Sequence, residues 1–315
     1  MVRNRALRRA LLWLLAVTLS GGFAVRLLPL QFRAIQDSVR AWRLGMREIR
    51  SENGLSGWSR GHGSACVVLV HGIGDSNPTW LRLLAQEGLQ SLRVIAWELP
   101  GHGGSDRPAP TVEGTAELRP RAMARRLHQA TRAAGCSGPA VWVGNSLGGW
   151  VSAWVALDYP EAVQGLVLLA PAGLDSQARH PKMPSMAGLL ENPTLESIQE
   201  FRARAYARQD AHYPTWVWQA ALERIRASSI RRVRAAVTPE DALDLHLGKV
   251  RAPTVILWGK QDRILPLDAS QDFRKLAPSG ISSFRELEDC GHLPQKEAPE
   301  KVVTAIRDVL AYGSY

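Results

Sequence analysis

Short apolar runs alternate with stretches of helical periodicity along the chain after residue 64. Apolar runs bounded by turn residues are typical of buried strands, and they occupy 65–70, 92–98, 140–144, 163–170, 254–258 and 282–287. Helical spacing occupies 79–90, 116–134, 147–159, 268–276 and 299–311. Strands that alternate with helices pair in parallel, with helices on both faces. The pattern predicts an α/β fold built on a mostly parallel, doubly wound sheet of about six strands.

The alternation stops between residues 174 and 250 and resumes at residue 251. This stretch contains no convincing buried strand, and prolines interrupt its helical patterns. It also carries a group of bulky residues: Phe201, Tyr206, His212, Tyr213, Trp216 and Trp218. We therefore expect residues 174–250 to form a helical cap, inserted before the penultimate strand of a core made of residues 65–173 and 251–315.

The first 32 residues are predicted to form a membrane anchor or a signal segment. Residues 10–25 form a stretch of sixteen residues without charge, preceded by four arginines. A helix of this length would be roughly 24 Å long, so a span requires residues up to about 32. A cleavable signal peptide is the alternative, although no A-x-A cleavage site stands out. Both interpretations make the protein membrane-associated or exported, and the side of the membrane stays open.

Residues 33–64 separate this segment from the core. Ile35, Val39, Trp42, Met46 and Ile49 recur at helical spacing, and arginines lie off that stripe. The pattern predicts a basic amphipathic helix over 33–50, which either packs on the core domain or lies on anionic headgroups. Residues 51–64 read as a glycine- and serine-rich linker with room for one short strand.

The charge of the chain is concentrated at its N-terminus. Ten arginines and two acidic residues lie in residues 1–50, which therefore hold +8 of the formal net charge of +10. Charge confined to such an extension indicates a membrane surface as partner and argues against nucleic acid. Zinc-type Cys/His spacing and RNA-binding aromatic motifs are absent from the sequence.

The three cysteines, Cys66, Cys136 and Cys290, are too few and too widely spaced for a disulfide framework. Cys66 starts one predicted central strand and Cys136 lies just before another, so a bridge between them is conceivable and stays open. Cys290 lies two residues before a candidate catalytic histidine. We interpret it as a small packed residue and not as a second nucleophile.

The stretch Gly144-Asn-Ser-Leu-Gly148 has the G-x-S-x-G pattern of a nucleophile elbow. An apolar run precedes it and a helical pattern follows, which is the strand–turn–helix context that the motif requires. Gly144 and Gly148 leave room for a backbone path that a Cβ would block. Ser146 is therefore the candidate nucleophile, presented at the beginning of a helix.

A serine nucleophile needs a neighbouring base, and the base needs an orienting acid. Asp262 follows one predicted strand and His292 follows the last one, so both lie at the carboxyl edge of the same sheet as Ser146. The order Ser146, Asp262, His292 is the nucleophile–acid–base order of α/β hydrolases. Asp175 is the fallback acid, and Asp289 is less suitable because it lies almost beside the histidine in sequence.

The remaining requirement is an oxyanion hole. The backbone N–H of Leu147, directly after the nucleophile, is one candidate donor. The second is the N–H of Ile73 in the loop after the first strong strand, where His71 and Gly72 support the loop conformation. His102 is interpreted as structural. This chemistry requires no metal and no organic cofactor.

Residues 65–312 resemble the α/β-hydrolase superfamily through five motifs: 71–74 (HGIG), 100–105 (PGHGGS), 144–149 (GNSLGG), 259–262 (GKQD) and 291–292 (GH). The segments 170–173 (APAG) and 290–294 (CGHLP) add a resemblance to small membrane-associated bacterial lipases and carboxylesterases. The resemblance implies ester hydrolysis through an acyl-enzyme with a Ser-His-Asp triad, on a small-molecule or lipid ester.

One departure from the family concerns the start of the fold. Members usually open with a two-strand hairpin before the first parallel strand, and here that place holds the basic helix and the linker. We expect the hairpin to be absent or vestigial, and the 33–50 helix is a candidate cover for the resulting sheet edge.

Two other functions fit parts of the sequence. The motif at 144–149 also occurs in carbon–carbon bond hydrolases of ring-cleavage dienoates, which would need cationic cap groups for the substrate carboxylate. A non-catalytic, membrane-tethered binding module of hydrolase fold is the third reading, but such modules normally carry a broken triad. Ester hydrolysis remains the leading hypothesis.

Overall fold

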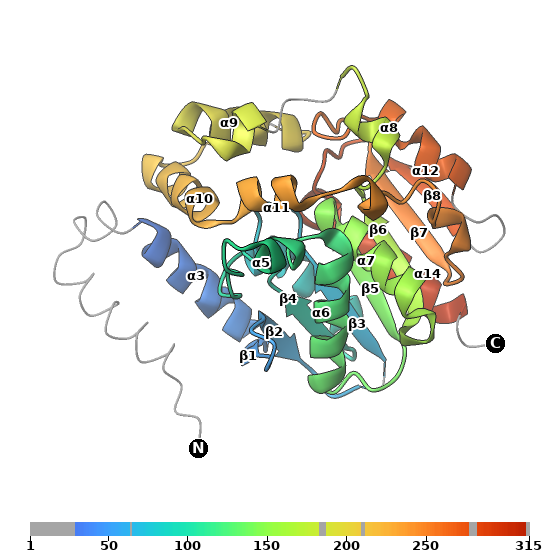
Figure 1. The fold of residues 1–315 in the computed structure, drawn as a ribbon. Helices are drawn as coiled ribbons and strands as arrows, with labels where there is room; N and C mark the ends of the chain where they lie inside the picture. Colours follow the sequence, from blue (N-terminus) through green and yellow to red (C-terminus); the bar gives the residue numbers. More distant parts are fainter. Residues whose placement is uncertain (1–28, 64, 183–186, 209–211, 277–281, 313–315) are drawn as a thin grey trace.

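The computed structural model describes residues 29–63, 65–182, 187–208, 212–276 and 282–312. Its centre is one sheet with the strand order β1-β2-β4-β3-β5-β6-β7-β8, and helices lie on both faces (Figure 1). The strands are β1 Arg47–Arg50, β2 Ser56–Arg60, β3 Cys66–Val70, β4 Arg93–Trp97, β5 Ala140–Asn145, β6 Val163–Leu169, β7 Thr254–Gly259 and β8 Ser282–Leu287. From β4 to β8 all neighbours pair in parallel, which confirms the doubly wound α/β prediction.

The number of strands differs from the prediction, because the sheet has eight and not about six. The expectation that the hairpin is absent or vestigial was wrong. β1 pairs antiparallel with β2, and β2 pairs antiparallel with β4. The hairpin was missed because its strands are short and mostly polar, with sequences REIR and SGWSR. Edge strands need few apolar residues, and the exposed charges of β1 discourage pairing with another chain.

The helices follow the chain in the expected alternation. They are α3 Pro29–Arg43, α4 Leu81–Leu84, α5 Val112–Ala116, α6 Pro120–Ala133, α7 Leu147–Asp158, α8 Asp175–Ala178, α9 Leu195–Ala205, α10 Thr215–Ala227, α11 Ile230–Ala236, α12 Gln271–Leu276, α13 Pro294–Glu297 and α14 Pro299–Tyr312. Strand residues alternate between two apolar clusters: Val68 and Val70 join the one that contains α6 and α7, and Val67 and Leu69 join the one that contains α4 and α14. Both faces of the central strands are therefore buried, as a parallel sheet requires.

The basic N-terminal helix is shorter than predicted and begins earlier, at residue 29 and not 33. α3 ends at Arg43, and residues 47–50 form strand β1, so Met46 and Ile49 do not belong to the helical stripe. α3 packs along α10, where the ring of Phe32 meets the ring of Trp216 edge-on at 5.3 Å. The sheet edge for which the 33–50 helix was a candidate cover is occupied by β1. Trp42, which belongs to the predicted apolar stripe, is 57% exposed.

The cap, residues 174–250, contains α8 to α11 and lies between β6 and β7 in the sequence. In its described residues there is no strand. Figure 1 shows α9, α10 and α11 on the side of the molecule where the parallel strands end. No helix within the described ranges is long and apolar enough to cross a membrane. Of the predicted anchor or signal segment at residues 1–32, residues 1–28 lie outside those ranges, and residues 29–32 begin α3.

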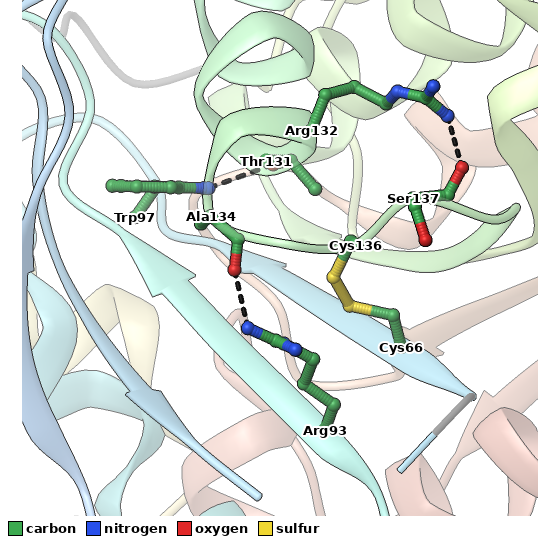
Figure 2. Close-up of a disulfide and its surroundings, with 8 residues drawn as sticks. All are labelled: Cys66, Arg93, Trp97, Thr131, Arg132, Ala134, Cys136 and Ser137. Carbon is green, nitrogen blue, oxygen red and sulfur yellow. Dashed lines mark hydrogen bonds between the residues drawn. A yellow bond between two sulfur atoms is a disulfide. The ribbon is translucent and has the colours of Figure 1, made fainter. Parts of the chain in front are cut away.

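A disulfide joins Cys66, the first residue of β3, to Cys136 in the loop between α6 and β5 (Figure 2). The two Cα atoms are 6.1 Å apart, which is within the range that disulfides span. Both residues are buried, and β3 and β5 are direct neighbours in the sheet. The bridge that the sequence left open therefore exists, and it connects the beginnings of two adjacent central strands.

Candidate active site

Ser146 occupies a strained turn between β5 and α7. Its backbone has φ 54° and ψ −118°, a positive φ that residues with a Cβ rarely adopt. The turn is possible because its neighbours lack side chains: a Cβ on Gly144 would come within 2.2 Å of the Gly148 carbonyl oxygen, and one on Gly148 within 2.0 Å of that of Val70. The backbone N–H of Ser146 donates to the carbonyl of Leu169 on β6, which ties the turn to the next strand.

His292 and Asp262 lie next to each other, although thirty positions separate them in sequence. The Nδ1 atom of His292 is 2.7 Å from Oδ2 of Asp262, and both side chains are buried. The other carboxylate oxygen of Asp262 accepts hydrogen bonds from the backbone N–H groups of Ile264 and Leu265, each at 2.8 Å. These two donors hold the carboxylate in place, and the carboxylate in turn orients the imidazole.

Asn145, which sequence reasoning passed over as the variable residue of the elbow motif, connects the nucleophile turn to the histidine loop. Its side-chain amide donates to the carbonyls of Leu169 at 3.0 Å and His292 at 2.9 Å. Its Oδ1 accepts from the amide of Gln295 at 3.2 Å, and Gln295 also contacts the Thr79 hydroxyl. Asn145, Gln295 and Thr79 are all buried. Their bonds set the position of the His292 loop relative to Ser146.

The loop at residues 71–74 lies against the nucleophile turn. A Cβ on Gly72 would come 3.3 Å from the Cβ of Ser146. The backbone N–H of Gly74 donates to Nε2 of His102 at 3.0 Å, and Nδ1 of His102 faces the Pro100 carbonyl at 3.1 Å. Burial and the neighbouring His71 together lower the pKa of His102 to about 3, so its ring is neutral and can accept this bond. His102 is thus a support of the loop.

His71 is fully buried, and Glu98 is its partner at the end of β4. Nε2 of His71 is 3.1 Å from Oε2 of Glu98, while Oε1 of Glu98 accepts from the backbone N–H of Asn77 at 2.9 Å. Burial opposes a charge on His71, but the neighbouring Glu98 carboxylate outweighs it and raises the pKa of His71. The pair joins the two ends of the 71–77 loop to β4.

The backbone N–H groups of Ile73 and Leu147 donate to no other group among the residues that the structure describes. Leu147 is the first residue of α7, where the helix dipole favours a negative charge. Both amides belong to the two segments that meet at Ser146. The arrangement can therefore offer two donors to a developing oxyanion.

The other candidates lie in different surroundings. Asp175, the fallback acid, is exposed and pairs with Arg179 on α8 at 3.4 Å. Asp289 is exposed as well. Burial raises the pKa of the Cys290 thiol, which leaves this residue without nucleophilic character. Across the described residues, no three His, Cys, Asp or Glu side chains converge as metal ligands do.

The fold and this geometry agree with a comparison to known protein families, in which residues 67–305 match the family described as the alpha/beta hydrolase family. The chain belongs to this family. It is 29% identical over 240 residues to Lipase 3 from Moraxella sp. (strain TA144), covering 74% of this chain and 73% of that protein. It is 26% identical over 262 residues to monoacylglycerol lipase ABHD6 from Mus musculus, covering 78% and 75%.

Among solved structures, this α/β hydrolase is similar to one described as a membrane phospholipase A and a novel bacterial virulence factor. The TM-score is 0.75 at 25% sequence identity, and the match covers 97% of this chain and 99% of the other. The similarity extends over the hydrolase core and the cap, and therefore includes the segment in which the alternation of strands and helices is interrupted.

Proposed function

We propose that this α/β hydrolase cleaves carboxylic esters of lipids through an acyl-enzyme. The observation that carries the proposal is the buried His292–Asp262 pair beside the strained Ser146 turn. His292 accepts the Ser146 proton, and the serine oxygen attacks the ester carbonyl. The N–H groups of Ile73 and Leu147 bind the oxyanion. His292 then protonates the departing alcohol, and activates the water that releases the acid and restores the serine.

The similar proteins support a lipid ester as substrate. Their names describe a lipase, a monoacylglycerol lipase and a phospholipase A. The cap carries the aromatic residues Tyr206, Tyr213 and Trp218, and the last two meet edge-on at 5.7 Å. Apolar side chains of this kind suit acyl chains more than they suit the soluble dienoates of the carbon–carbon bond hydrolases.

The test is labelling and turnover by the full chain and by its Ser146→Ala variant. A fluorophosphonate should label the wild type at Ser146, and a panel of esters of different acyl length should be hydrolysed. Ser146→Ala should lose labelling and on the order of 10⁶ in kcat. Ser137→Ala, a change at an exposed serine, is the matched control. Labelling of the variant, or hydrolysis of no ester by the wild type, would exclude the proposal.

We further propose that the catalytic domain works on the non-cytosolic side of a membrane, held there by its N-terminal segment. The Cys66–Cys136 disulfide supports this side, because disulfides form and persist in oxidising compartments. The arginines that α3 exposes, Arg40 and Arg43, suit an anionic membrane surface. In a bacterial host, external protease should digest the domain in spheroplasts but not in intact cells. Protection in spheroplasts would contradict this orientation.

A further inference from the structure

Asp75 and Lys296 lie together beside the proposed oxyanion hole, and the positive charge of the cap residue Arg224 acts on the pKa of both. Asp75 follows the 71–74 loop directly, Lys296 belongs to α13, and Arg224 belongs to the cap helix α10. Nζ of Lys296 is 3.7 Å from Oδ2 of Asp75. Burial alone would raise the pKa of Asp75, but the positive charges of Lys296 and Arg224 outweigh it and lower that pKa to about 2. Both cations therefore act on the same carboxylate.

The sequence neighbours of Lys296 and Arg224 contact the nucleophile turn and the 71–74 loop. The residue before Lys296 is Gln295, whose amide contacts Asn145 next to the nucleophile. The residue after Arg224 is Ile225, and a Cβ on Gly74 would come 2.8 Å from the Cδ1 of Ile225. Lys296 and Arg224 therefore lie near the contact between the cap and the 71–74 loop.

Three carboxylates lie in this part of the described structure: Asp75, Glu98 and Glu297. Asp75 is the one carboxylate shared by Lys296 and Arg224, and its Oδ1 also accepts from the Ser76 N–H at 2.9 Å. Glu98 is paired with His71, and Glu297 accepts from the backbone N–H groups of Ala207 and Gly291.

The polar atoms of the two cations are only partly satisfied. Nε of Arg224 is buried and has no hydrogen-bond acceptor among the described residues. The ammonium of Lys296 hydrogen-bonds the hydroxyl of Tyr206, and the Lys296 side chain is 24% exposed. The buried Nε–H of Arg224 and the partly exposed ammonium of Lys296 therefore remain available to a group from outside the chain.

We propose that Lys296 and Arg224 form a subsite for an anionic group of the ester substrate, a phosphate or a carboxylate a few bonds from the scissile carbonyl. The inference rests on the proposed esterase function and adds selectivity to it. An anion bound here supplies the acceptor that the Nε–H of Arg224 lacks and adds an ionic contact with Lys296. Hydrogen bonds between guanidinium or ammonium groups and anions are the strong ones in proteins, so the selectivity should be large.

The test compares esters with one acyl chain and different head groups. 1-Acylglycerol is neutral, 1-acylglycerol 3-phosphate carries a phosphate, and the acyl ester of glyceric acid carries a carboxylate. The wild type should show a higher kcat/KM for at least one anionic ester than for the neutral one. The two anionic arms identify which anion the site takes.

Lys296→Met and Arg224→Met should each lower the anionic-to-neutral ratio of kcat/KM about tenfold and leave the neutral ester within about threefold of the wild type. Asp75→Asn should raise the ratio, because it removes a negative charge beside the two cations while keeping Oδ1 for the Ser76 N–H. Arg231→Met is the control, since this exposed cap residue lines a separate hollow of about 500 Å³ on α11. Equal rates of fluorophosphonate labelling show that each variant is folded.

The outcomes separate the two proposals. Hydrolysis of neutral and anionic esters with equal kcat/KM, or a ratio that none of the three substitutions changes, overturns the anionic subsite and leaves the esterase assignment intact. A ratio that falls as much in Arg231→Met as in the two test variants overturns it as well, because the preference then comes from general surface charge. Absence of labelling and of all ester turnover overturns the esterase assignment itself.

Discussion

The Cys66–Cys136 disulfide should contribute several kcal/mol to folding. The bridge closes a chain segment with a sequence separation of 70 residues. The chain-entropy model for a loop of this length gives a loss of denatured-state entropy worth about 4 kcal/mol at 25 °C. Replacing both cysteines by alanine removes the cross-link and, at two small buried positions, little apolar contact. The double variant Cys66→Ala/Cys136→Ala should therefore unfold about 4 kcal/mol more easily, or at roughly 8 °C lower Tm.

Urea unfolding followed by circular dichroism measures this difference directly. Reductant should destabilise the wild type by a similar amount and leave the double variant unchanged. Cys290→Ala is the control, because Cys290 is a free, buried thiol that takes no part in the bridge. A double variant within about 1 kcal/mol of the oxidised wild type would refute the reasoning, since a bridge between neighbouring, already paired strands would then add nothing to the sheet.

Three further predictions concern the site. Asn145→Ala removes the amide that donates to the carbonyls of Leu169 and His292, so urea unfolding should show a loss of stability of about 2–3 kcal/mol. Ester kinetics should show a fall in kcat that is larger than any rise in KM. Unchanged stability would contradict the bridging role. The pKa of His102 is lower in the folded state, about 3, than its unfolded value, so stability should fall as pH drops from about 6.5 towards 3, by up to about 1.4 kcal/mol per pH unit. His102→Gln should flatten that part of the pH profile, and an unchanged slope would assign it to other groups. Gly148→Ala forces a Cβ to within 2.0 Å of the Val70 carbonyl oxygen, so the soluble variant should fail to react with a fluorophosphonate, and normal labelling would show that the turn can relax.

The core and the three candidate catalytic residues could be predicted from sequence because one geometric rule connects them. Parallel strands end at a common edge, so residues that directly follow β5, β7 and β8 come near one another whatever the details of packing. Ser146, Asp262 and His292 each occupy such a position. Glycine spacing around Ser146 then predicted the turn, since a side chain at Gly144 or Gly148 would collide with backbone.

The hairpin could not be predicted in the same way because its stability does not come from its own side chains. β1 and β2 are held by main-chain hydrogen bonds to a sheet that is already formed, and Trp58 is the large apolar side chain that β2 buries. A period-two apolar pattern is weak in strands this short. The same limit applies to α3, where the pattern of Ile35 and Val39 continued by coincidence into Met46 and Ile49 on the following turn and strand.

The polar supports of the site were missed for a different reason. Asn145 and Gln295 are separated by 150 positions, and Glu98 lies 27 positions from His71. Neither pair has a spacing that sequence can reveal. In retrospect the available signal is the position of these residues in sequence: Glu98 directly follows β4, Asn145 is the last residue of β5, and Gln295 lies three residues after His292. Such positions are buried by the loops that cover them, and buried polar groups need partners.

The placement of Arg224 has a consequence for how selectivity can change in this fold. On the proposed assignment, every reacting group comes from a core loop, whereas Arg224 comes from α10 of the cap. Ile225 and Ile230 of the cap pack against Gly74 and hold the 71–74 loop from above, so the cap position is already fixed by apolar contacts. A substitution at residue 224 therefore changes the charge that the substrate meets without moving the oxyanion donors. Selectivity for the head group and the chemistry at Ser146 can then vary independently, because different segments of the chain supply them.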